Sequence, residues 1–273
     1  MNSTRTLLVL AAVVAAGLPE ASGSPERRLV IVGGGERPKA ALARFVAWAG
    51  GGSARVLVVP WASAEPKESC ESLIAELRAQ GPGSLECGPA APLDDKGKAG
   101  RLDAAARARF LKELASATGV FFTGGDQARI MDVLADAELL AAVRTRHAEG
   151  VVFGGTSAGA AVMSLRMITG EGDFTVLDGD QVVVREGLGL VPGVIVDQHF
   201  VKRQRENRLF GLVLKHPEER GVGIEEDTAL LVTNGRQAEV VGKGPVLLVD
   251  ADGKDRLRIR LLRTGQSVDL GKR

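Results

Sequence analysis

The residue pattern with the clearest chemical meaning surrounds Ser157. An apolar run at residues 151–153 leads into Gly154-Gly155-Thr156-Ser157-Ala158-Gly159, so glycines stand two positions before and two positions after the serine. Small neighbours permit a strained turn between strand and helix that pushes a serine hydroxyl outward as a nucleophile. A helix start also favours developing negative charge, which makes the Ala158 N–H a candidate oxyanion donor. The alternative is a phosphate-binding or purely structural glycine turn.

A second glycine turn follows another strand-like run, in Phe121-Phe122-Thr123-Gly124-Gly125-Asp126-Gln127. Loops at the carboxyl ends of parallel strands share one rim of the sheet, so we expect this turn to face Ser157. The Gly125 N–H is then a second candidate oxyanion donor, and Gln127 is a candidate ligand for an amide or a carboxylate. The alternative is a simple helix start, with Asp126 as its cap.

A serine nucleophile needs a base, and the chain has only three histidines. His199 closes an apolar run at residues 194–198, and an imidazole at a strand end suits a base at neutral pH. His147 lies at a charged helix end, where we expect a solvated cation. His216 stands before a proline and is expected to end a helix. His199 is therefore the best candidate base, although on its own a buried structural role fits equally well.

Cationic residues follow this histidine: Lys202, Arg203, Arg205 and Arg208. On a regular helix Arg203 and Arg205 would diverge by about 200°. Arginines that fork from an irregular segment suit bidentate binding of a carboxylate. The alternative is an ordinary charged surface, with Glu206 as an internal partner.

Three acids, Glu225, Glu226 and Asp227, stand between two β-like runs. One of them is a candidate to orient the imidazole and to stabilise its cation. Their spacing does not choose among the three, and a plain acidic turn is the alternative.

The elements that must position these segments predict an α/β fold, with a mostly parallel, doubly wound sheet and helices on both faces. Apolar β-runs alternate with helical stretches, which are expected at residues 39–48, 68–79, 104–117, 127–134, 138–148 and 158–165. After Thr169 the segments are shorter and more strand-like, which predicts later sheet strands and an antiparallel C-terminal extension. No repeat or linker interrupts the chain, so residues 24–273 are expected to form a single domain.

The composition narrows the class of partner. Lys and Arg total 35 against 34 Asp and Glu, which gives no reason to expect nucleic acid or an anionic membrane. Aromatic residues are 4% of the chain and tyrosine is absent, which argues against a stacking platform for bases. Cys70 and Cys87 show no metal-ligand spacing, and a disulfide between them is allowed but not favoured.

The first 23 residues read as a secretory signal peptide. Arg5 is followed by an apolar run at residues 7–18 that is too short to span a membrane, and small residues follow at 21–23. We therefore expect a secreted or periplasmic protein with no membrane association after cleavage. An uncleaved anchor and a misassigned start codon are the alternatives, and without a functional signal the protein would be cytoplasmic.

Taken together, these segments resemble cyanophycinase, of the serine peptidase family that also holds aspartyl dipeptidase. The likeness spans roughly residues 29–249. The matching stretches are Ile31-Val32-Gly33-Gly34-Gly35-Glu36, Phe122-Thr123-Gly124-Gly125-Asp126-Gln127, Gly155-Thr156-Ser157-Ala158-Gly159-Ala160, Asp197-Gln198-His199-Phe200 with the arginines after it, and His216-Pro217 through Gly223-Ile224-Glu225-Glu226-Asp227-Thr228-Ala229. Each motif is weak alone, but their order and joint presence are specific.

The resemblance implies a triad of Ser157, His199 and Glu226 and a fold like that of class I glutamine amidotransferases. It places six residues in the substrate pocket: Gln127, Asp197, Gln198, Arg203, Arg205 and Arg208. The implied substrate is cyanophycin, a poly-aspartate backbone with arginine on each side chain, which is cleaved to β-aspartyl-arginine dipeptides. No metal or organic cofactor is implied, and family members are often dimeric, so a homodimer is expected.

The implied pocket suits that polymer, because arginines can hold a free α-carboxylate while Asp197 and glutamine amides can meet a guanidinium. The expected mechanism is attack by Ser157 with His199 as base, then hydrolysis of an acyl-enzyme. An α-aspartyl dipeptidase is the first alternative, although the arginines after His199 favour the polymer enzyme. A noncatalytic binding protein on an amidotransferase-like fold is the second. An ester lipase is least favoured, since no large apolar lid segment is evident.

Overall fold

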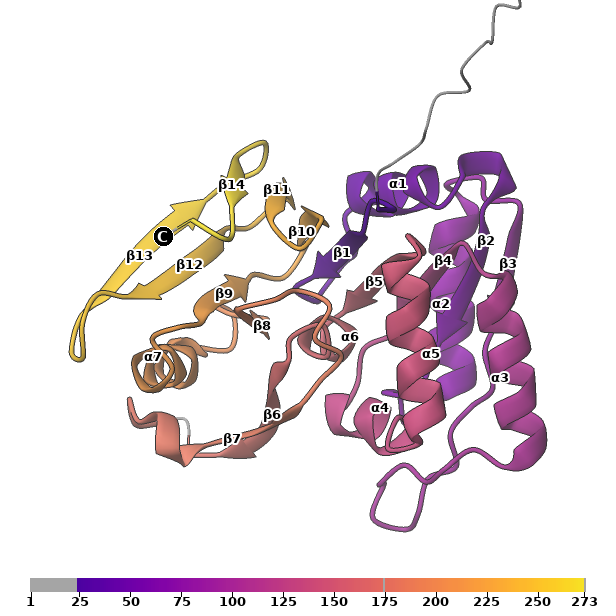
Figure 1. Ribbon diagram of the computed structural model, residues 1–273, viewed down its shortest axis with the longest axis horizontal. Helices are drawn as coiled ribbons and strands as arrows, with labels where there is room; N and C mark the ends of the chain where they lie inside the picture. Colours follow the sequence, from indigo (N-terminus) through magenta and orange to yellow (C-terminus); the bar gives the residue numbers. More distant parts are fainter. Residues whose placement is uncertain (1–23, 174, 273) are drawn as a thin grey trace, which may run out of the picture.

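The structure is a computed structural model that describes residues 24–173 and 175–272. The predicted signal peptide, residues 1–23, lies outside the described residues. The described chain forms an eight-stranded sheet, a four-stranded sheet and a two-stranded hairpin (Figure 1). Within these residues no helix combines the length and the apolar character that a membrane span requires.

The large sheet has the strand order β14-β11-β10-β1-β5-β4-β2-β3. Its parallel part comprises β1 (Arg28–Val32), β5 (Val152–Thr156), β4 (Gly119–Phe122), β2 (Arg55–Val59) and β3 (Ser84–Cys87). Its antiparallel part comprises β10 (Thr228–Thr233), β11 (Gln237–Gly242) and β14 (Ser267–Asp269). The central parallel strands are continuous apolar runs because helices cover both of their faces.

Helices cover the large sheet on both sides, which confirms the predicted doubly wound α/β class. One face packs against α1 (Lys39–Trp48) and α2 (Pro66–Arg78). The other packs against α3 (Ala104–Ser116), α4 (Gln127–Val133) and α5 (Ala137–Ala148). Short 3₁₀ turns occur at Gly51–Ser53 and Gly179–Gln181.

The helix predicted at residues 158–165 is shorter than expected. It ends after one turn, as α6 (Ala158–Ala161). The carbonyl groups of Val162 and Met163 accept bonds from the N–H groups of Leu188 and Leu190, at 2.7 and 2.8 Å. Within the segment, the N–H groups of Met163 and Ser164 donate to carbonyls three residues back rather than four, at 3.2 and 3.4 Å, so the regular helix ends here and the chain pairs with residues 188–190.

The sequence predicts that the later strands continue the large sheet, but several of them form a second sheet. A separate sheet has the order β13-β12-β9-β8, with β8 (Val194–Gln198) and β9 (Arg220–Ile224) parallel and with β12 (Val246–Ala251) and β13 (Leu257–Leu262) antiparallel. Helix α7 (Glu206–Lys215) packs on this sheet, and β6 (Arg166–Gly172) with β7 (Val182–Glu186) forms the hairpin beside it (Figure 1). The turn after β9 returns the chain to the large sheet at β10, so strands adjacent in sequence belong to different sheets. The antiparallel C-terminal strands confirm the predicted extension.

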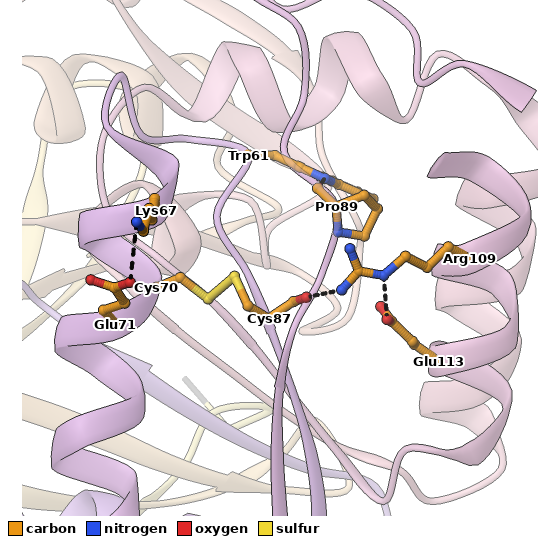
Figure 2. Close-up of a disulfide and its surroundings, with 8 residues drawn as sticks. All are labelled: Trp61, Lys67, Cys70, Glu71, Cys87, Pro89, Arg109 and Glu113. Carbon is orange, nitrogen blue, oxygen red and sulfur yellow. Dashed lines mark hydrogen bonds and ion pairs between the residues drawn. A yellow bond between two sulfur atoms is a disulfide. The ribbon is translucent and has the colours of Figure 1, made fainter. Parts of the chain in front are cut away.

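Cys70 and Cys87 form a disulfide, which the sequence allowed but did not favour (Figure 2). Helix α2 packs against β3, and this brings the two Cα atoms to 6.1 Å, within the range that a disulfide spans. Two further bonds fix the chain beside the bridge: the Arg109 guanidinium donates to the Cys87 carbonyl at 2.7 Å, and the Trp61 indole N–H donates to the Pro89 carbonyl at 2.8 Å.

The structure also corrects the expectation that His147 is a solvated cation. It is 4% exposed, and its ring meets the Phe153 ring edge-on at 5.5 Å. Burial lowers the pKa of His147 to about 4, so the ring is neutral at pH 7. The reason is the orientation of α5, which turns this position toward the large sheet. His216 ends α7, as predicted.

Candidate active site

Ser157, His199 and Glu226 meet where the two sheets approach each other. Ser157 follows β5 of the large sheet, whereas His199 follows β8 and Glu226 follows β9 of the smaller one. The Ser157 hydroxyl lies 2.7 Å from Nε2 of His199, and Nδ1 of the same ring lies 2.6 Å from Oε1 of Glu226. A nucleophile, a base and an acid that orients the base therefore stand in hydrogen-bond order.

The backbone at Ser157 is strained, as the glycine pattern predicts. Its φ is 53° and its ψ is −110°, a conformation that costs about 1–3 kcal/mol. A Cβ added to Gly155 would lie 2.1 Å from the Gly159 carbonyl oxygen, and one added to Gly159 would lie 2.4 Å from the Phe122 carbonyl oxygen. Only glycine fits at both positions, so the turn that presents the hydroxyl depends on the two flanking glycines.

The glycine turn after β4 lies beside the serine. A Cβ added to Gly124 would be 3.4 Å from Cβ of Ser157, and Gly125 lines the same cavity as the serine. Gly125 has a φ of 137°, and an added Cβ would lie 2.0 Å from the Ala62 carbonyl oxygen. The first N–H groups of a helix have no acceptor inside the helix, and Ala158 is the first residue of α6. Both candidate oxyanion donors therefore border the nucleophile.

The same turn also starts a helix. The Asp126 side chain accepts the N–H of Ala128 at 2.8 Å and so caps α4. The segment therefore both starts a helix and borders the same cavity as Ser157. Gln127, the next residue, lines the cavity, and its amide nitrogen donates to the Ile168 carbonyl at 2.8 Å.

The three acids after β9 have three different partners, which the sequence could not resolve. Glu226 bonds to the imidazole. Glu225 accepts the backbone N–H groups of residues 201 and 202, at 2.7 and 3.0 Å, and so holds the turn that follows the histidine. Asp227 accepts the N–H of Glu36 at 2.7 Å. Adjacent acids in this turn thus orient the base, fix its loop and anchor the first glycine loop.

That glycine loop, residues 33–35, had no role in the sequence interpretation beyond the resemblance. The N–H of His199 donates to the Gly33 carbonyl at 2.7 Å, and the N–H of Asp227 donates to the Gly34 carbonyl at 2.9 Å. A Cβ added to Gly34 would lie 2.1 Å from a ring carbon of His199. Three glycines directly after a buried parallel strand were the signal that could have placed this loop at the site.

The environment of His199 suits a base. The residue is 6% exposed. Burial lowers its pKa below the ordinary 6.5, and the nearby Arg203 and Arg205 lower it further, while the bond to Glu226 opposes these effects. The imidazole is therefore neutral at pH 7 and able to accept the proton of Ser157.

Ser157 opens on a cavity of about 820 Å³. Five of the six predicted substrate-binding residues line it: Gln127, Gln198, Arg203, Arg205 and Arg208. A second cavity, of about 910 Å³, is lined by residues such as Arg37, Lys39 and Lys243 and by no member of the triad. The first cavity is therefore the one in which chemistry at the serine can take place.

Asp197 is the exception among the predicted pocket residues. It is 1% exposed and lies behind the cavity wall rather than on it. Both oxygens of its carboxylate accept bonds from the Arg208 guanidinium, with Nε at 2.7 Å from Oδ2. The structure thus corrects the expectation for Asp197: the guanidinium that it meets belongs to Arg208, because a buried carboxylate requires a charged partner. Its effect is to fix Arg208 at the wall.

The arginines leave an irregular segment, as the sequence predicts. Residues 201–204 form turns, and Arg205 precedes the first residue of α7. Arg205 donates to the Gln198 carbonyl at 2.7 Å and to the Gln198 side chain. Burial lowers the pKa of Arg205 to about 10, so it stays charged at pH 7. Arg203 is exposed at the cavity rim.

One group of potential metal ligands occurs in the described part of the chain, formed by His216, Glu218 and Glu219. It does not line the cavity of Ser157. Glu219 pairs with the Arg166 guanidinium, a cation that would compete with a metal ion.

A hydroxyl, an imidazole and a carboxylate in this order, on an α/β sheet and beside a large cavity, define a serine hydrolase. The sequence profile of peptidase family S51 matches residues 29–240, so the chain belongs to that family and is a serine peptidase. Cyanophycinase of Geminocystis herdmanii is 37% identical over 229 residues, which cover 81% of this chain and 80% of that protein. Cyanophycinase of Trichormus variabilis is 36% identical over 226 residues, which cover 81% and 73%.

Two solved structures share the fold. A peptidase from an acI-B1 actinobacterium has a TM-score of 0.65 at 23% identity, covering 89% of this chain and 96% of that one. A putative peptidase E protein from Listeria monocytogenes has a TM-score of 0.53 at 15% identity, covering 80% and 98%. At these identities the likeness concerns the fold alone.

Proposed function

We propose that the protein hydrolyses the poly-aspartate backbone of cyanophycin and releases β-aspartyl-arginine dipeptides. The observation that carries the proposal is the bonded series from Ser157 through His199 to Glu226, which opens on a cavity lined by arginines. Relatives at 36 and 37% identity bear the name cyanophycinase, which supports this substrate over other peptides.

In the proposed reaction the Ser157 oxygen attacks the scissile carbonyl carbon while Nε2 of His199 takes the hydroxyl proton. Glu226 stabilises the imidazolium that forms. The tetrahedral oxyanion accepts N–H bonds from Ala158 and Gly125. Collapse breaks the C–N bond, and the imidazolium protonates the leaving amine. Water then attacks the acyl-enzyme with His199 as base, which releases the acid product and restores the serine.

The cavity supports this substrate through its charge. In the proposed complex Arg203 and Arg205 hold carboxylates of the substrate end, because a guanidinium can bind a carboxylate through two parallel bonds. Arg208, whose Nε and one terminal nitrogen are bonded to Asp197, adds positive charge at the wall. The amide nitrogen of Gln127 donates to the Ile168 carbonyl, and the amide oxygen of Gln198 accepts a bond from Arg205. Both glutamines line the cavity, where in the proposed complex their side chains bind amide groups of the substrate backbone.

The test is product analysis after incubation of the purified protein with cyanophycin and, separately, with an α-aspartyl dipeptide. Release of β-aspartyl-arginine supports the proposal, whereas cleavage of the α-aspartyl dipeptide alone would assign the chain to the aspartyl dipeptidases. Ser157→Ala should lower kcat by at least about 10³-fold. Ser53→Ala, at an exposed 3₁₀ turn, is the control. Undiminished activity of the Ser157 variant would refute the serine mechanism.

Export and a homodimer are part of the same proposal. The disulfide between Cys70 and Cys87 supports export, because such bonds persist mainly in oxidising compartments. Fractionation of cells that express the full chain, with N-terminal sequencing of the mature protein, tests the export. A soluble cytoplasmic product with an intact N-terminus would contradict it. Light scattering of the purified protein tests the dimer.

A further inference from the structure

The wall of the Ser157 cavity is strongly cationic. Seven Lys and Arg residues line it, against three acids: Asp126, Asp132 and Glu171. An excess of positive charge attracts carboxylates but repels a guanidinium. A substrate with arginine on each side chain therefore requires an acid at the place where its guanidinium lies.

Two of the three acids already have partners within the chain. Asp126 caps α4, and Asp132 lies 3.0 Å from the Arg185 guanidinium. The side chain of Glu171 is exposed, and no residue within 24–173 or 175–272 forms a hydrogen bond or ion pair with its carboxylate. Glu171 is thus the acid of this wall that is free to bind a cationic group of the substrate.

The hairpin places Glu171 on the cavity by an irregularity of its strands. The pairing of β6 with β7 shifts register between Ile168 and Gly172, and residues 169–171 line the cavity. The Thr169 hydroxyl donates to the Val183 carbonyl at 3.0 Å and accepts the N–H of Glu171 at 3.2 Å. Such irregularities re-aim a side chain relative to regular strands. The backbone is fixed here, while the Glu171 carboxylate stays available.

We infer that Glu171 is a specificity-determining residue that binds the guanidinium of a substrate arginine. The inference rests on the proposed function and deepens it. The two carboxylate oxygens accept two parallel N–H bonds from the guanidinium, and the arginines beyond His199 hold a carboxylate of the same substrate. A substrate that carries both charges therefore meets both kinds of partner within one cavity.

The test compares two synthetic cyanophycin oligomers of equal length, one with arginine and one with citrulline, whose neutral urea has nearly the same shape as a guanidinium. The wild type should cleave the arginine oligomer with the higher kcat/KM. Glu171→Gln should lower kcat/KM for the arginine oligomer by about tenfold, mainly through KM, and change the citrulline value little. Glu186→Gln is the matched control, because Glu186 lies at the end of the same hairpin and outside this cavity.

The outcomes separate this inference from the function on which it rests. An unchanged preference for arginine over citrulline in the Glu171 variant would overturn the inference and leave the proposed function standing. The same loss of preference in Glu186→Gln would also overturn it, because the effect would then belong to the hairpin as a whole. A wild-type protein that cleaves neither oligomer would overturn both.

Discussion

Ser157 and His199 are bonded to each other but are positioned in different ways. The serine depends on a local turn, in which Gly155 and Gly159 stand two residues away and the strand and the helix are adjacent in sequence. The histidine depends on distant segments. Its N–H bonds to the loop after β1, its ring packs on Gly34, and Glu226 follows 27 residues later.

Each half of the site should therefore be sensitive to different substitutions. The serine side should respond to changes within its own turn, since its geometry is set over a few residues. The histidine side should respond to changes far away in the sequence, in the loop after β1 and in the turn after β9. Substitutions that distinguish the two halves should differ widely in the size of their effects.

The largest effect is expected at the acid of the histidine side. Glu226→Gln keeps the size of the side chain but removes the charge that orients the imidazole and stabilises its cation. We expect kcat to fall by about 10⁴-fold, measured by product release at saturating substrate. The neighbouring variant Glu225→Gln retains an oxygen that can accept the N–H bonds of residues 201 and 202, and should lose less than about tenfold. Equal losses in both variants would mean that the turn acts as a unit and that Glu226 has no separate role.

Because the serine turn is set locally, loss of a crosslink elsewhere on the large sheet should lower stability without lowering catalysis. The double variant Cys70→Ser with Cys87→Ser removes a crosslink that spans 17 residues, and should lower the free energy of unfolding by about 3 kcal/mol. Urea unfolding measures this change, and a reductant should lower the stability of the wild type in the same way. Because the bridge touches no member of the triad, kcat of the folded variant should stay within about twofold of the wild type. A kcat that falls as steeply as the stability would show that the bridge also positions the serine, and would contradict its purely local positioning.

A substitution far from His199 in sequence should damage the histidine side. In Gly34→Ala the new methyl group would overlap the imidazole, and the positive φ of 107° adds backbone strain. We expect a loss of about 10²-fold in kcat, because small displacements of a catalytic group have effects of that size. Gly52→Ala is the control, since an added Cβ there meets nothing within 4 Å, and it should keep nearly full activity.

The same division explains what the sequence could predict. The parallel strands β1, β2, β4 and β5 and the helices up to α5 follow from local apolar patterns, and the Ser157 turn follows from glycine spacing. Strand β3, with the sequence Ser-Leu-Glu-Cys, has no such pattern. The sheet to which β8 and β9 belong depends on the path of the whole chain, which no local pattern contains. Likewise, a separation of 17 residues between Cys70 and Cys87 does not reveal that α2 packs against β3.

Within the site, the sequence shows which side chains are present but not the direction in which each one points. Glu225, Glu226 and Asp227 are three acids in one turn, and Asp227 has a φ of 55°, so each side chain points to a different partner. The choice of Glu226 came from the resemblance and not from spacing. The resemblance places Asp197 in the substrate pocket, and the sequence does not show that Arg208, eleven residues later, turns back onto it.

The smallest expected effect concerns the pH dependence of the base. His199 must be neutral to take the Ser157 proton, so kcat/KM should fall as the pH decreases through the pKa of its imidazole. Burial and two nearby arginines hold that pKa below 6.5, so the acidic limb should have its midpoint below pH 6.5. Glu226 raises the pKa, and Glu226→Gln should therefore move the limb further toward acid, whereas Arg203→Gln should move it toward 6.5. A wild-type limb above pH 6.5 would show that the carboxylate outweighs burial, and that the distant acid sets the charge of the base more strongly than its enclosure does.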